Sequence, residues 1–125
     1  MPLNVETSEN AKYDFLKTHY YKCDYLKLKK AVIEVCESLD FDLTHEDDDY
    51  FELLEQRNDV NLTIKFNEFN KRETSLDIFV DAYYVFMKKT KVEKLLRTIY
   101  VNLNKKVEFK GLGLHPEVLK WNTRS

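Results

Sequence analysis

Four strand-like runs follow one another through the middle of this 125-residue chain, separated only by short polar turns. The runs cover residues 41–45, 50–55, 60–69 and 75–87. In the third run apolar residues alternate with polar ones from Val60 to Phe66, as in a strand with one face in water. Short turns join antiparallel neighbours, whereas parallel strands need long crossover connections. An antiparallel sheet is therefore expected.

Two amphipathic helices are expected on either side of these runs. The first follows Asp24, whose carboxylate can cap a helix, and its apolar stripe runs at helical spacing from Leu28 to Leu39. The second starts at Thr90, which forms a capping box with Glu93, and reaches a stop near Gly111. Each helix has one apolar side to bury against the sheet.

One more strand is predicted before the first helix, in the aromatic run at 13–23. The element order is then β-α-β-β-β-β-α. The expected fold is α+β, a two-layer sandwich in which an antiparallel sheet of four to five strands carries both helices on one face.

The length fits a single domain, which we assign to residues 11–125. Residues 1–10 are polar and lack a period, which predicts a disordered N-terminus. Residues 111–125 are too apolar for a free tail, so we expect this segment to pack back on the domain. Its apolar residues are Leu114, Val118, Leu119 and Trp121.

The alternation of the last run is lost from Phe79 onward, where both faces become apolar. A sheet with one wet face in a monomer does not explain this change, so we expect something to cover that end. The candidate interaction or ligand surface comprises Phe79, Tyr83, Tyr84, Val85 and Phe86. The leading hypothesis is a non-catalytic protein-interaction domain that binds a protein partner or itself, as a homodimer or other oligomer.

Two other functions stay open. A small-molecule carrier would hold its ligand in an apolar pocket between the sheet and the second helix. That pocket would be lined by Tyr84, Phe86, Ile99 and Tyr100. An acidic immunity-type or decoy protein would instead present the region from Asp40 to Asp59 to a basic partner. The charge distribution favours that reading, because residues 31–60 carry eleven acidic residues and one arginine.

No catalytic or metal-binding constellation is visible, so neither enzyme activity nor a cofactor is expected. The three histidines lie far apart, and Cys23 and Cys36 occupy apolar positions. Asp77 and Asp81 are read as the wet face of a strand rather than an acid–base pair. The acids of 45–49 are contiguous and lack a central glycine, which indicates a solvated hairpin turn rather than a calcium loop.

Nucleic acid is not the expected partner. Strand aromatics with interleaved lysines could stack bases, but the sequence pI is about 5.9 and the 31–60 region is strongly acidic. The sequence has no leader-like or membrane-spanning apolar run, which predicts a cytoplasmic protein without a membrane partner. Sixteen lysines against four arginines suit a bacterial source.

Overall fold

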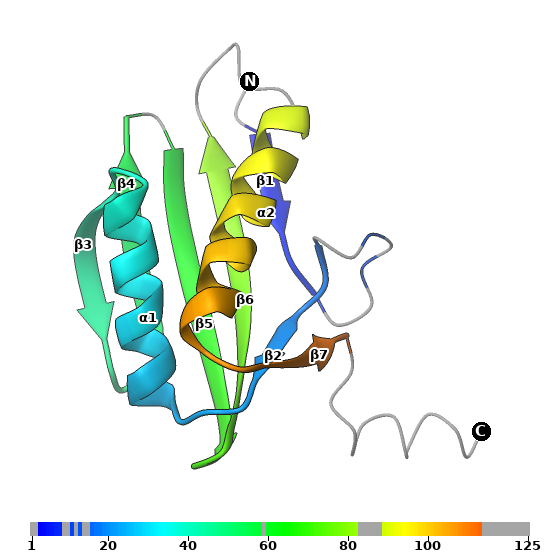
Figure 1. Ribbon diagram of the computed structural model, residues 1–125. Helices are drawn as coiled ribbons and strands as arrows, with labels where there is room; N and C mark the ends of the chain where they lie inside the picture. The colour runs from blue at the N-terminus through cyan, green and yellow to red at the C-terminus, as the bar shows by residue number, and fades with distance from the viewer. Residues whose placement is uncertain are drawn as a thin grey trace.

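The computed structural model describes residues 3–8, 11, 13, 16–58, 60–82 and 89–113, and these form one antiparallel sheet with two helices (Figure 1). The elements are β1 (Leu3–Glu6), β2 (His19–Tyr21), α1 (Tyr25–Ser38), β3 (Asp42–Asp47), β4 (Glu52–Arg57), β5 (Val60–Asn70), β6 (Glu73–Ala82), α2 (Lys89–Lys106) and β7 (Phe109–Leu112). Both helices cover the same face of the sheet (Figure 1). The predicted α+β class and antiparallel sheet are confirmed.

The predicted size and order of the sheet are wrong in detail, because the described sheet has seven strands. Leu3–Glu6 pairs with β6 where a disordered N-terminus was expected. The predicted strand at 13–23 is reduced to His19–Tyr21, and β7 follows α2 where the tail was expected to begin. These strands are only three or four residues long, too short for an alternating pattern to reveal. Residues 114–125 lie outside the described residues.

The strand order is β3-β4-β5-β6-β2-β7, and β1 also pairs with β6. β1 and β2 share one edge of β6 in succession, with Leu3 opposite Ala82 and His19 opposite Leu76. From the first of these pairs to the second, the position on β6 changes by six residues and the position on the N-terminal segment by sixteen. β1 and β2 therefore act as one strand with an insertion of ten residues between them.

Asp77 holds together the two ends of this insertion. Its Oδ1 accepts hydrogen bonds from the hydroxyls of Thr7 and Thr18, each at 2.7 Å. Thr7 Oγ1 also accepts from the Ile78 amide at 2.8 Å, so the gap between β1 and β2 is bridged by side chains. Burial raises the pKa of Asp77, whereas the two threonine hydroxyls oppose that rise.

The core lies between the sheet and the helices. The alternation predicted for β5 is confirmed, with Leu62 and Ile64 fully buried on the helix-covered face. Asp24 caps α1 as predicted, accepting from the Lys27 amide at 2.9 Å. α2 already includes Lys89, one residue before the predicted cap at Thr90. The helices are linked on their outer sides by an ion pair between Lys106 and Glu34 at 3.1 Å.

Candidate interaction surface

The predicted surface at the end of β6 is described only at Phe79. The other four members of that set lie outside the described residues: Tyr83, Tyr84, Val85 and Phe86. Phe79 is half-buried on the helix-free face of the sheet, opposite Thr63 on β5 and Glu6 on β1. Leu54 of β4 lies on the other side of Thr63 in the same cross-strand row. Phe79 and Leu54 therefore flank one threonine on this face.

A second, sharper feature is the turn that joins β3 to β4. Asp47 Oδ1 accepts from the backbone amides of Asp49 at 3.0 Å and Tyr50 at 3.1 Å, which makes an Asx turn. Phe51 follows with φ of 53°, in the left-handed region that disfavours bulky residues. Its carbonyl accepts from the Phe66 amide at 2.9 Å. The turn is thus fixed on both sides and carries backbone strain at Phe51.

The first turns of α1 brace this turn. The ring of Tyr25 meets Phe51 edge-on at 4.6 Å between centroids and Phe66 at 5.2 Å. Its hydroxyl donates to Asp48 Oδ1 at 2.7 Å. Burial is the main cause that raises the pKa of Tyr25, and this hydrogen bond adds to it. Lys29 bonds the same Asp48 oxygen at 2.8 Å and also pairs with Glu46. Hydrogen bonds from Lys29 and Tyr25 lower the pKa of Asp48, which keeps it ionised.

Tyr50 stands at the tip of this braced turn and is 80% exposed, the largest value among the exposed large hydrophobic side chains of the described residues. Most exposed loops that carry an aromatic ring are free to move. Here the backbone on both sides of the ring is tied down. A rigid exposed tyrosine offers contact area with little entropy to lose on binding.

β3 extends the same surface along the edge of the sheet. Among the described residues it pairs with β4 alone, and every residue of the strand is at least partly exposed. The exposed acidic residues of the hairpin are Asp42, Glu46, Asp48 and Asp49, and Asp47 and Glu52 are partly exposed. His45 lies at the outer edge, with Nε2 4.0 Å from Asp47 Oδ2. Lys29 is half-buried beneath them, so the outward charge of the hairpin is negative.

The sequence predicts a solvated hairpin turn here, and the structure confirms a turn. It lies two residues later than expected, because β3 continues to Asp47 and β4 begins at Glu52. The strand predicted at 50–55 therefore includes Tyr50, which the structure instead places at the tip of the turn. The only signal for it is an aromatic residue directly after a run of acids.

The nucleophile candidates are buried. Cys23 and Cys36 are free thiols inside the core. Burial raises the pKa of the Cys23 thiol to about 11. Burial is also the main cause that raises the pKa of the Cys36 thiol, and the nearby Glu55 adds to it. Both therefore stay protonated thiols at neutral pH, which suits packing rather than attack. Among the described residues no group of three His, Cys, Asp or Glu side chains could hold a metal ion.

Of the strand aromatics that could stack bases, Tyr20 and Tyr21 are packed inside, Phe79 is half-buried, and Tyr83 and Tyr84 lie outside the described residues. Tyr20 and Tyr21 are 2% and 0% exposed. Tyr21 donates its hydroxyl to Asn104 Oδ1 of α2 at 2.8 Å. His19, between Tyr21 and α2, stacks on Tyr100. His19 and Tyr21 thus join β2 to the second helix, whereas the ring of Tyr20 lies 6.0 Å from that of Phe69 on β5.

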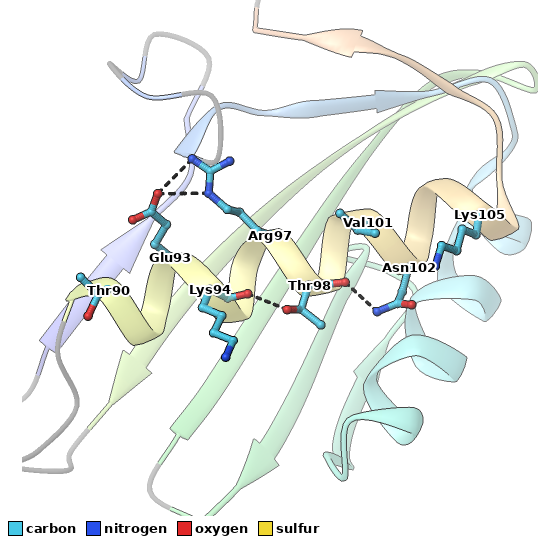
Figure 2. A pocket seen from close by; sticks show the side chains of 8 residues that line it. All are labelled: Thr90, Glu93, Lys94, Arg97, Thr98, Val101, Asn102 and Lys105. Atoms are coloured by element: carbon cyan, nitrogen blue, oxygen red, sulfur yellow. Dashed lines mark hydrogen bonds and ion pairs between the residues drawn. The ribbon is translucent and has the colours of Figure 1, made fainter.

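Of the four residues predicted to line an apolar pocket between the sheet and the second helix, Ile99 is fully buried and Tyr100 is 4% exposed, while Tyr84 and Phe86 lie outside the described residues. A shallow groove of about 510 Å³ instead follows the outer face of α2 (Figure 2). Seven of its eight lining residues are polar or charged, the exception being Val101. Three of these side chains bond within the helix: Arg97 to Glu93, Thr98 to the Lys94 carbonyl and Asn102 to the Thr98 carbonyl.

No protein-family model matches this chain, and no curated protein matches it in sequence. Within the described residues, no helix combines the length and apolar character needed to cross a membrane.

Proposed function

We propose that this chain is a non-catalytic protein-interaction domain that offers the β3–β4 hairpin to a basic protein partner. The observation that carries the proposal is the exposure of Tyr50, whose side chain is 80% exposed. It lies on a turn in which Asp47 accepts from the Tyr50 amide and the Phe51 ring packs against Tyr25 of α1. Tyrosine is one of the residues most often found at the energetic centre of interfaces.

The charge of the hairpin selects the kind of partner. Asp48 and Asp49 directly precede Tyr50 on the turn, and further acidic side chains lie along β3, which has no partner but β4 within the described part of the chain. Complementary charge speeds encounter and excludes partners of like charge. A lysine or arginine of the partner can also sit over the Tyr50 ring, since cations are attracted to aromatic faces. This reading favours the acidic immunity-type or decoy class among the functions predicted from the sequence.

An NMR titration tests the proposal with a defined probe, a lysine- and arginine-rich peptide added to the labelled full chain. We expect shift changes centred on residues 42–52 and an affinity that falls as salt is raised. Tyr50→Ala should weaken binding about tenfold, which corresponds to about 1.4 kcal/mol.

The matched control is Val101→Ala, which removes an exposed apolar side chain (55% exposed) from α2. It should bind the peptide as the wild type does. The proposal fails if the shift changes map away from the hairpin, or if Tyr50→Ala binds as tightly as Val101→Ala.

Self-association through the helix-free face is a second candidate, favoured by Phe79 and Leu54 lying on either side of Thr63. Phe79→Asp would place a charge in that row and should dissociate a dimer built on it. Sedimentation velocity decides: a wild-type chain that sediments as a monomer at high concentration excludes this candidate.

A further inference from the structure

Glu55 is an acidic residue buried where water cannot reach it. It lies on β4, opposite Leu43 of β3 and Leu62 of β5, and it is 1% exposed. Neither carboxyl oxygen has a hydrogen-bond partner among the described residues. A buried carboxylate without a partner is costly, and the cost is removed when it takes up a proton.

The charged groups near Glu55 oppose its ionisation, and they are the carboxylates of Glu37 on α1 and Asp42 on β3. The Cys36 thiol of α1, a weak donor, has the smaller, opposite effect and lowers the pKa of Glu55. β5 presents the apolar Leu62. Burial is the main cause that raises the pKa of Glu55 to about 7, and the carboxylates of Glu37 and Asp42 add to it.

The nearest cation on the same strand is already engaged. Arg57 Nη1 donates to the Leu39 carbonyl at the end of α1 at 2.8 Å, and its guanidinium lies 4.5 Å from the centre of the Phe41 ring. Arg57 therefore ties the end of α1 to β4 without neutralising Glu55. Within the described part of the chain, the end of α1 and β4 therefore meet at Glu55, a buried acid without a bonded cation.

We propose that Glu55 is a proton-operated latch between α1 and the β3–β4 edge of the sheet. With the proton on the carboxyl, the group is neutral and α1 packs directly over it. When the proton leaves for a water molecule, the buried carboxylate draws water between α1 and β4 and the edge loosens. The latch does not depend on the partner proposed above.

Amide hydrogen exchange of the full chain tests the latch at about pH 6 and about pH 8, after correction for the chemical rate of exchange. Two variants accompany the wild type. Glu55→Gln keeps the shape and cannot ionise, and Glu52→Gln removes a carboxylate from the same strand on the helix-free face. In the wild type, protection of β3 and β4 should fall about tenfold in total, because stability falls about tenfold per pH unit between the unfolded and the folded pKa of Glu55 and levels off above the folded value of about 7. Glu55→Gln should hold its protection, and Glu52→Gln should behave as the wild type.

The proposal is overturned if Glu55→Gln loses protection as the wild type does, or if the wild type shows no loss. A second measurement needs no variant: the carbon-13 shift of the Glu55 carboxyl should titrate near neutral pH. A midpoint close to 4.3, the ordinary value for glutamate, would overturn the latch even if Glu55→Gln failed to fold.

Discussion

The rings of His19 and Tyr100 stack face to face, with centroids 3.4 Å apart and an angle of 3° between their planes. This contact joins β2, which lies between β6 and β7 in the sheet, to α2. Both residues are buried, and His19 Nδ1 is also 2.9 Å from the Lys17 carbonyl. The stack shows why a three-residue strand can hold its place: its side chains, rather than its few ladder bonds, dock it to the helix.

Two tyrosines on either side of this contact should respond differently to loss of the hydroxyl. Tyr100 Oη is buried near the Thr7 hydroxyl but forms no hydrogen bond of regular geometry among the described residues, whereas Tyr21 Oη donates to Asn104. Tyr100→Phe should leave the free energy of unfolding unchanged or raise it, and Tyr21→Phe should lower it by about 1 kcal/mol. Urea unfolding of the two variants side by side measures the difference. Equal losses would mean that the Tyr100 hydroxyl is bonded after all.

The gap between β1 and β2 predicts a coupled pair of mutations. Thr7 and Thr18 donate to the same oxygen of Asp77. Thr7→Val and Thr18→Val should each cost about 1–2 kcal/mol, because each removes a hydrogen bond to a carboxyl oxygen. The double variant should differ from the summed single losses, since the two donors share one acceptor. A double-mutant cycle by urea unfolding checks this, and strict additivity would show that the threonines act separately.

The sequence predicts well the parts of the fold that repeat a pattern. β5 alternates over seven residues and α1 keeps its apolar stripe for three turns, so their type and buried face follow from spacing alone. β1 and β7 have no such length, and each depends on a partner that is distant in sequence, β6 for β1 and β2 for β7. The same limit applies to the candidate site. The acidic residues of the turn are visible in the sequence. The contacts of Tyr25 and Phe66 with the turn that carries Tyr50 are seen only in the folded chain.

The end of α1 offers a way to stabilise the protein. Asp40 has φ of 66°, its amide donates to the Glu37 carbonyl at 3.0 Å, and the Phe41 amide donates to the Cys36 carbonyl at 2.9 Å. This is a Schellman motif, whose left-handed position glycine fills without steric cost. Asp40→Gly should raise the free energy of unfolding by about 1 kcal/mol. Thermal or urea unfolding measures it, with Asp42→Gly in β3 as a control that should destabilise.

The buried Glu55 also sets a pH dependence for the stability of the whole chain. Its folded-state pKa of about 7 lies above the ordinary value for a glutamate, so the unfolded state releases this proton first as pH rises. The stability that the neutral carboxyl contributes is therefore complete below about pH 4.5 and is lost as pH rises through 7. The loss amounts to about 3 kcal/mol.

Asp77, whose pKa is also raised, contributes in the same direction, so the wild-type curve alone does not isolate Glu55. The difference between wild type and Glu55→Gln does, because Asp77 is present in both. Urea midpoints measured from about pH 5 to about pH 8 should converge toward the acid end and separate toward the alkaline end, with Glu55→Gln the more stable. Parallel curves would mean that Glu55 is solvated and titrates in the folded protein as it does in the unfolded chain.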